Sequence, residues 1–126
     1  MPSFISATIT LSLIRMLNTY QYKVRLMFEW GGGTLWSGND YTRDKYGFGN
    51  IENALPISKN LVQRLGEMQV WHDTALNWEY PPDPGPWSPE QYDEFEKAVI
   101  DIMQDIKQEL GQSFEVVYVK LGQFGG

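Results

Sequence analysis

The sequence predicts an α+β fold in which two helices pack on one face of a small β-sheet. Three observations predict it. Residues 20–36 alternate apolar and polar side chains and contain a run of glycines, which is typical of a β-hairpin. Two segments, at about 58–75 and 89–110, repeat apolar side chains at helical spacing. Residues 114–121 are dense in β-branched and aromatic side chains, which indicates a strand that completes the sheet.

The length and composition indicate a single domain over residues 1–126, because 42% hydrophobic residues supply one core. The chain has no cysteine, which excludes disulfides and cysteine chemistry and favours a reducing compartment. We therefore expect a cytoplasmic protein. No apolar run approaches the roughly 18–20 residues of a membrane span, so we expect no membrane association.

The net charge of −6 is concentrated in one part of the chain. Residues 73–110 hold ten Asp and Glu against two Lys, a net charge of −8, whereas residues 1–72 hold seven Lys and Arg against five Asp and Glu. An acidic surface repels phosphate backbones and attracts basic surfaces, so we expect a basic protein partner and no nucleic acid. The alternative is a solvated helix face that serves solubility alone.

Residues 1–19 allow two interpretations. Apolar and polar residues alternate over residues 5–13, which predicts an additional strand at the edge of the sheet. The well-patterned strand begins only after Met16, so this segment could also be an extension outside the core. The sequence leaves both interpretations open.

The first strand of the hairpin has one apolar face, formed by Tyr20, Tyr22, Val24, Leu26, Phe28 and Trp30. Residues 31–33 are all glycine, and we expect them to adopt positive φ angles in a tight turn. Residues 34–36 would then fold back beside Phe28 and Trp30. Residues 37–56 have no sustained period and predict a long loop with room for one short turn of helix.

Both helices have clear start signals. Ser58 is the expected N-cap of the first helix, and Gly66 in its middle suggests a close approach to the sheet. Ser88 and Gln91 form a capping box for the second helix. Its buried stripe is Tyr92, Phe95, Val99, Ile102, Met103, Ile106 and Leu110. Because residues 114–121 are apolar on both faces, we expect them to form the central strand.

Two segments are candidates for a partner-binding surface. Residues 77–87 contain four prolines, so this loop is stiff and extended. We favour an interpretation in which its tryptophans fold inward over the core; the alternative is a recognition loop with outward-facing aromatics. The outer face of the second helix is acidic. The candidate residues are Asp93, Glu94, Asp101, Asp105, Trp78, Tyr80, Glu79 and Asp83.

His72 is the only histidine, and its neighbour Asp73 suggests a general base oriented by a carboxylate. Adjacent helical residues do not face each other, however, and His72 continues the apolar row of its helix. We therefore expect a half-buried, hydrogen-bonded structural histidine. Glu29 is expected to form an ion pair on the wet face of the hairpin, with Lys23, Arg25 or a loop residue as its partner and a cross-strand pair as the plain explanation. No residue spacing matches a metal site, so we expect no metal, cofactor or catalytic residue.

The motifs MFEWGGGTLW, WHDTALNW and PWSPEQYDEFEKA carry a resemblance to known proteins. Over about residues 22–118 the chain resembles the small bacterial immunity proteins that accompany polymorphic or contact-dependent toxins. The resemblance implies a cytosolic, non-enzymatic protein that binds a cognate toxin. The acidic helix is compatible with that role, since nuclease toxins have basic clefts. The alternatives are a small hydrolase that uses His72 with Glu29 or Asp73, and an aromatic-lined module that binds a carbohydrate or a peptide.

Overall fold

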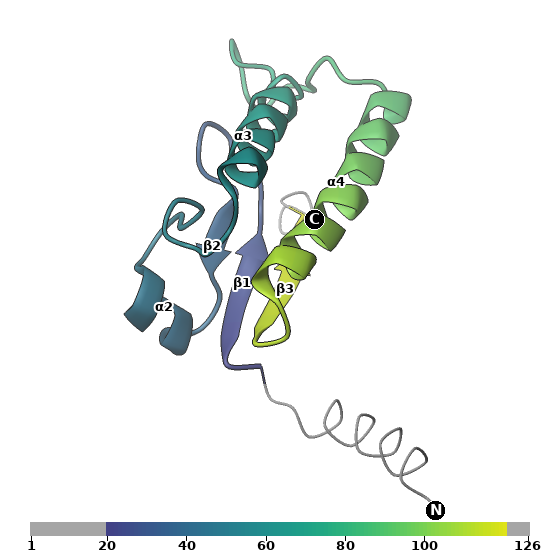
Figure 1. Cartoon of the computed structure of the whole chain (residues 1–126). Helices are drawn as coiled ribbons and strands as arrows, with labels where there is room; N and C mark the ends of the chain where they lie inside the picture. Colours follow the sequence, from purple (N-terminus) through teal and green to yellow (C-terminus); the bar gives the residue numbers. More distant parts are fainter. Residues whose placement is uncertain (1–19, 121–126) are drawn as a thin grey trace, which may run out of the picture.

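A computed structural model describes residues 20–120, which form three strands and three helices (Figure 1). The strands are β1, Tyr22–Leu26, β2, Leu35–Ser37, and β3, Phe114–Tyr118. The helices are α2, Asp40–Tyr46, α3, Lys59–Asp73, and α4, Pro89–Leu110. The possible edge strand within residues 1–19 and the last residue of the predicted strand, Leu121, lie outside the described residues.

β1 lies in the middle of the sheet, whose strand order is β2-β1-β3. β2 is antiparallel to β1, with Leu35 opposite Leu26, and β3 is parallel to β1, with Val116 opposite Val24. Within residues 20–120 β3 is therefore an edge strand, and the prediction of a central strand at 114–121 is wrong. β3 pairs with β1 on one side only, and Tyr118 at its end packs against the core and binds Glu96 of α4.

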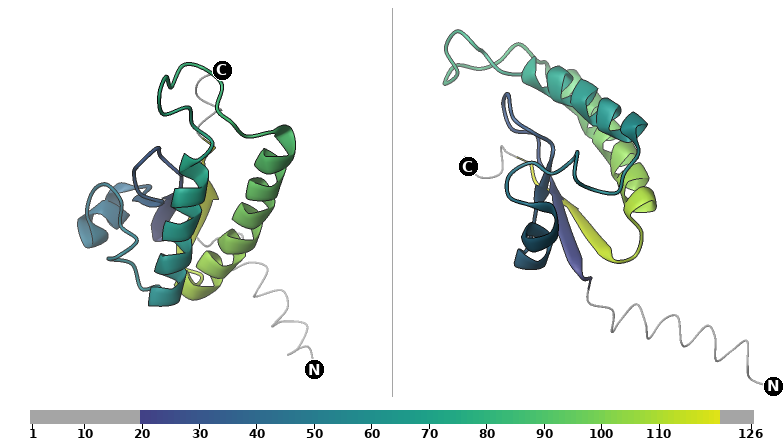
Figure 2. Two further views of the ribbon diagram at one scale, coloured as in Figure 1. Left: turned by 90° about the horizontal axis from the view of Figure 1, so that it is seen from above. Right: turned by 60° about the vertical axis from the view of Figure 1, so that its left-hand side comes forward.

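The two long helices lie side by side over one face of the sheet, as predicted (Figure 2). They supply the crossover that the parallel pairing of β1 with β3 requires. The core between the helices and the sheet contains fully buried side chains from β1, β2, α3 and α4. Among them are Val24, Leu26, Leu35, Leu61, Leu65, Phe95, Val99, Ile102 and Ile106.

The connection between β1 and β2 differs from the predicted tight turn. Only the first of its three glycines, Gly31, has a positive φ angle, of 70°. Position 33 requires a glycine because a Cβ there would overlap the side chain of Asn50. The strands pair up to Leu26 and Leu35, so Phe28 and Trp30 lie in the loop. The expectation of positive φ angles at residues 32 and 33 is therefore wrong.

The segment predicted as a long loop contains the seven-residue helix α2, beside β1 and β2 (Figure 1). Asn39 caps it by accepting a hydrogen bond from the backbone N–H of Thr42. The hydroxyl of Thr42, which is fully buried, in turn accepts a hydrogen bond from the backbone N–H of Lys23 at 2.8 Å. The helix is short and has no apolar stripe, so its contacts with β1, and not its own periodicity, fix it.

The predicted limits of the long helices agree with the structure to within two residues. Ser58 accepts a hydrogen bond from the backbone N–H of Leu61. Ser88 and Gln91 form both hydrogen bonds of the capping box. Gly66, however, is exposed and has nothing within 4 Å of the position of a Cβ, so the expected close approach to the sheet does not occur there.

Candidate functional site

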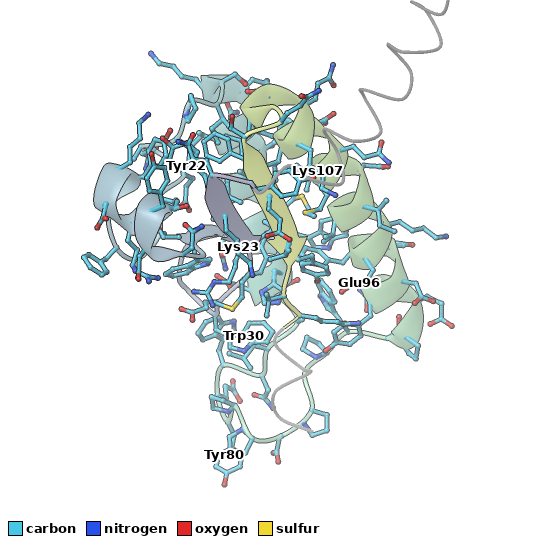
Figure 3. All side chains as sticks on the ribbon, turned by 90° about the horizontal axis from the view of Figure 1, so that it is seen from below. Tyr22, Lys23, Trp30, Tyr80, Glu96 and Lys107 are labelled. Atoms are coloured by element: carbon cyan, nitrogen blue, oxygen red, sulfur yellow. The ribbon has the colours of Figure 1, made fainter. Side chains whose placement is uncertain are left out.

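One end of the molecule gathers aromatic side chains from four segments that are distant in sequence. Trp30 comes from the β1–β2 loop, His72 from the end of α3, Trp78, Tyr80 and Trp87 from residues 77–87, and Tyr92 from the first turns of α4. We call these six residues the aromatic end. Figure 3 shows Trp30 and Tyr80 at this same end. Trp30, Trp78, Tyr80 and Tyr92 are 39%, 55%, 59% and 42% exposed, which is unusual for such large apolar groups.

Asp73 holds the glycine turn against the end of α3. One oxygen of its carboxylate, Oδ1, accepts hydrogen bonds from the backbone N–H of Gly31 at 3.1 Å and from the side-chain amide of Gln69 at 2.9 Å. The same amide nitrogen of Gln69 donates to the backbone carbonyl of Glu29 at 2.6 Å. The role of Asp73 is therefore to position the loop that carries Trp30.

The proline-rich loop is fixed by its tryptophans, but they point in different directions. The indole N–H of Trp87 donates to the Thr74 hydroxyl at 2.8 Å, and its ring packs on the core. The indole N–H of Trp78 donates to the backbone carbonyl of Asp73 at 2.7 Å, while its ring stays more than half exposed. The inward interpretation is thus confirmed for Trp87 and wrong for Trp78, and Tyr80 is also outward-facing.

His72 is half-buried and stacks on the Trp30 ring, with centroids 4.1 Å apart and planes 21° apart. Its Nδ1 is 3.8 Å from Asp73 Oδ1, too far for a hydrogen bond, and is buried without a partner among residues 20–120. The expected hydrogen bond of this histidine is therefore not made. Burial lowers the pKa of His72 below its ordinary value of 6.5, although the charges of Asp73 and Glu96 partly offset the shift.

The hydrolase alternative gains no support from this geometry. Asp73 is committed to Gly31 and Gln69 and does not orient the imidazole. Glu29 lies beyond the end of β1. None of the ion pairs within residues 20–120 includes it, so the predicted ion pair with Lys23, Arg25 or a loop residue is not formed there.

A His72→Gln substitution tests the buried neutral state of the imidazole. Because the pKa is lowered in the folded state, the unfolded chain binds a proton more readily than the folded chain below about pH 6.5. His72 therefore leaves the free energy of unfolding of the wild type unchanged above that pH. As the pH drops further, this group lowers the free energy of unfolding by at most about 1.4 kcal/mol per pH unit. The glutamine variant lacks this component.

Urea unfolding of both proteins between pH 7.5 and pH 5 measures the difference. We expect the advantage of the wild type to be largest at pH 7.5 and to shrink as the pH falls. Other groups titrate in both proteins, so they cancel in the comparison. Two parallel curves would show that His72 keeps an ordinary pKa.

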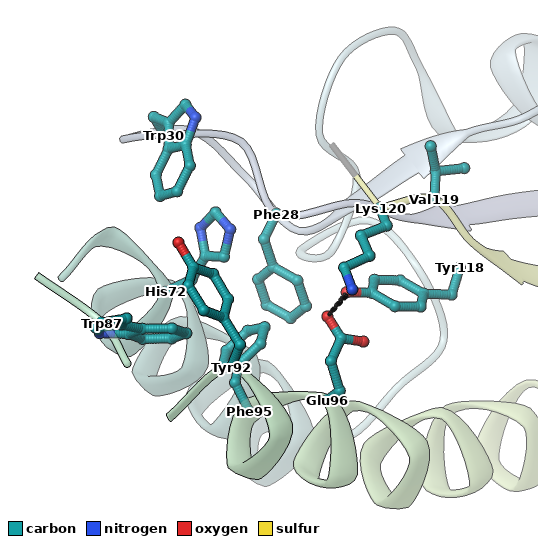
Figure 4. Close-up of a pocket in the computed structure, with 10 residues that line it drawn as sticks. All are labelled: Phe28, Trp30, His72, Trp87, Tyr92, Phe95, Glu96, Tyr118, Val119 and Lys120. Carbon is teal, nitrogen blue, oxygen red and sulfur yellow. Dashed lines mark hydrogen bonds and ion pairs between the residues drawn. The ribbon is translucent and has the colours of Figure 1, made fainter. Parts of the chain in front are cut away.

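Beneath the aromatic end is a pocket of about 160 Å³, which we call the aromatic pocket (Figure 4). It lies between the β1–β2 loop, the end of α3, the first turns of α4 and the end of β3. Its lining residues are Phe28, Trp30, His72, Trp87, Tyr92, Phe95, Glu96, Tyr118, Val119 and Lys120. Most of the lining is therefore aromatic.

The charged side chains that line this pocket are Glu96 and Lys120, which lie next to each other (Figure 4). The Tyr118 hydroxyl donates to Glu96 Oε1 at 2.9 Å, and burial together with that carboxylate raises the pKa of Tyr118 well above its ordinary value of 10.0. Lys120 Nζ is 3.6 Å from the same oxygen. Sequence reasoning missed Glu96, Tyr118 and Lys120. The spacing of Tyr92 and Glu96, four residues apart on one helix face, was the available signal.

The acidic candidates divide into two groups. Asp93 and Glu94, on the first turns of α4, and Glu79 and Asp83, on residues 77–87, are exposed around the aromatic end. Asp101 is exposed further along α4. Asp105 lies toward α3, where it forms an ion pair with Arg64 at 2.7 Å, so it is only partly available to a partner. The structure thus brings six of the eight candidates to one end and leaves Asp101 and Asp105 apart.

Within residues 20–120 no helix is long and apolar enough to cross a membrane. The same part of the chain contains no group of three or more His, Asp or Glu side chains that could hold a metal ion.

The fold and the site define a class of protein, a small α+β domain with an aromatic pocket at the end that also carries exposed carboxylates. The particular family follows from comparison of the sequence. The chain belongs to the Serratia CdiI immunity protein-like family, whose model matches residues 22–121. This match confirms the resemblance found in the motifs MFEWGGGTLW, WHDTALNW and PWSPEQYDEFEKA. No curated protein matches the chain.

Proposed function

We propose that this chain is a non-enzymatic immunity protein of a bacterial contact-dependent toxin system, and that it neutralises a cognate toxin in the cytoplasm by binding it. Membership of the family supports the role. The observation that carries the mode of binding is the presence of exposed aromatics and exposed carboxylates at the same end of the molecule. Binding there would cover the basic active surface of the toxin.

The two kinds of side chain make different contributions. Trp30, Trp78, Tyr80 and Tyr92 are the residue types that supply most of the binding energy in protein interfaces. The surrounding carboxylates attract a basic partner over longer distances and so raise the association rate more than they slow dissociation. The exposed acidic residues in the segments that carry these aromatics are Glu79, Asp83, Glu90, Asp93 and Glu94, which we call the acidic rim.

The aromatic lining of the pocket also favours the second candidate, a module that binds a carbohydrate or a peptide. The two functions make different demands on the partner. A toxin must bind as a folded protein, whereas a carbohydrate or a short peptide would bind as an isolated ligand. In a titration with the toxin encoded beside the gene for this chain, binding of the folded toxin would favour the immunity protein. Absence of binding would favour the carbohydrate or peptide module.

The acidic rim is tested by reversing two charges, Asp93→Lys with Glu94→Lys. We expect association with that toxin to slow roughly tenfold at about 0.1 M salt, since the reversed charges repel a basic surface. The difference should nearly vanish at about 1 M salt, where the Debye length falls from about 10 Å to about 3 Å. Stopped-flow kinetics at the two salt concentrations measure both effects.

The matched control is Asp44→Lys with Glu67→Lys, which makes the same change in net charge at exposed positions on α2 and α3. We expect its association rate to stay within about twofold of the wild type, because the Debye length at about 0.1 M salt is only about 10 Å. Equal and salt-independent association rates for all three proteins would show that the acidic rim is not part of the interface. Asp105 is unsuitable for this test because its reversal would also break the ion pair with Arg64.

A further inference from the structure

We propose that the aromatic pocket is an anchor site for the side chain of one arginine of a basic protein partner, with Glu96 as the acceptor of its guanidinium group. The proposal rests on the proposed function, since it names the group of the toxin that this end of the molecule recognises. It is carried by the size of the pocket, its walls, the hydrogen bonding of Glu96 and the charge around its mouth.

The volume of the pocket fits one side chain. Its value of about 160 Å³ is close to the roughly 150 Å³ of an apolar cavity that holds a benzene-sized molecule. Sites for larger small molecules occupy roughly 300–1,000 Å³. An oligosaccharide or a folded peptide segment would therefore not fit inside, whereas a single long side chain would.

The walls favour a flat cation. Trp30 is held face to face with His72, and Trp87 packs edge to face against Tyr92 with ring centroids 5.1 Å apart. The faces of such rings attract a cation, and a planar guanidinium can also stack on them, which an ammonium cannot. Because burial keeps His72 neutral near pH 7, the imidazole does not repel the incoming charge.

Glu96 has capacity for another donor. Its Oε1 accepts the hydroxyl of Tyr118, and no hydrogen bond to its Oε2 is formed by any residue from 20 to 120. Lys120 stands 3.6 Å from Oε1 with its side chain 49% exposed, so this ion pair is weak and easily displaced. A guanidinium could donate to Oε2 while Tyr118 keeps its hydrogen bond and holds the carboxylate in place.

The charge outside the pocket complements a cationic guest. Asp93 and Glu94 follow Tyr92 directly in the chain and are exposed. Glu79, Asp83 and Glu90, in the segments that carry the other exposed aromatics, are also exposed. An arginine on a basic toxin surface would thus meet attraction at this end of the molecule and a carboxylate inside the pocket.

Two variants test the pocket without opening the core. Glu96→Gln keeps the shape and an oxygen that can accept the Tyr118 hydroxyl, but it removes the charge. Tyr92→Ala removes a ring that is 42% exposed. We expect each to weaken binding of the toxin encoded beside this gene at least about tenfold in calorimetry, with unchanged melting temperature. The matched controls are Glu67→Gln and Phe48→Ala, at exposed positions outside the pocket, which should bind as the wild type does.

A small probe tests the pocket independently of any toxin. Titration of the wild type with n-propylguanidinium should shift the indole N–H resonances of Trp30 and Trp87 in a saturable manner. The neutral isostere n-propylurea should not, and Glu96→Gln should abolish the response. An equal response to the urea, or none to the guanidinium, would overturn the assignment of an arginine.

The outcomes separate the two proposals. If the wild type binds the toxin and both pocket variants bind it equally well, the anchor site is overturned while the proposed function stands. If the wild type does not bind the toxin, the proposed function fails. The titration with n-propylguanidinium then decides by itself whether the pocket recognises the cation.

Discussion

Phe95→Ala should lower the free energy of unfolding by about 3–5 kcal/mol, the cost of removing a large buried aromatic ring. Phe95 is 2% exposed and stands at the point where the core meets the aromatic pocket. Its ring centroid is 5.1 Å from that of Phe28, 5.0 Å from Trp71 and 5.5 Å from Trp87. Truncation would therefore leave a cavity shared by the β1–β2 loop, α3 and the proline-rich loop.

The control for this substitution is Ile100→Ala on the same helix, where the side chain is 60% exposed. We expect it to change the free energy of unfolding by no more than about 0.5 kcal/mol. Urea unfolding followed by tryptophan fluorescence and by circular dichroism measures both variants. A loss below about 1 kcal/mol for Phe95→Ala would show that the ring does not join these segments.

Gly85→Ala should destabilise the protein by about 1–3 kcal/mol, the usual cost of forcing atoms into a packed site. A Cβ at Gly85 would overlap the carbonyl oxygen of Ala75 and lie 2.7 Å from its carbonyl carbon. The obstacle is backbone, so no side chain can rotate to relieve it. The proline-rich loop must then move away from the end of α3, and with it the exposed rings of Trp78 and Tyr80.

Gly66→Ala is the matched control, because it adds the same methyl group to an exposed helical glycine with free space around it. We expect that change to be stabilising by up to about 1 kcal/mol. Thermal unfolding of both variants should move the two melting temperatures in opposite directions. An unchanged melting temperature for Gly85→Ala would mean that the loop does not pack against Ala75.

The long helices were predictable because their signals are local. Ser88, Gln91 and the apolar stripe of α4 all lie within one continuous segment, and the capping box forms as the sequence predicts. The same holds for Ser58 and α3. In both cases the hydrogen bonds at the helix start involve residues three positions apart, so no information from the rest of the chain is needed.

The misplaced elements depend on contacts between distant residues. α2 is fixed by the hydrogen bond between Thr42 and the backbone of Lys23, nineteen residues away. The position of β3 at the edge depends on its parallel pairing with β1, which no local pattern specifies. The pattern of residues 114–121 predicts burial on both faces, but only the face that carries Phe114, Val116 and Tyr118 packs on the core, while Glu115 and Val117 on the other face are only partly buried.

The aromatic end and the pocket beneath it were only partly predictable for the same reason. Trp78, Tyr80, Asp93 and Glu94 were identified because proline content and charge are visible in the sequence. Glu96 was not, since its partners Tyr118 and Lys120 are more than twenty residues away. Asp73 was considered as a partner of its neighbour His72, whereas it binds Gly31, forty-two residues away.

The measurement that tests the central claim most directly is survival of cells that produce the toxin encoded beside this gene. The wild-type chain, produced in the same cells, should restore growth, and Tyr92→Ala combined with Asp93→Lys and Glu94→Lys should fail to do so at equal protein level. Asp44→Lys with Glu67→Lys should protect as the wild type does. Growth arrest in the presence of the wild-type chain, or full protection by the triple variant, would contradict neutralisation through the aromatic end.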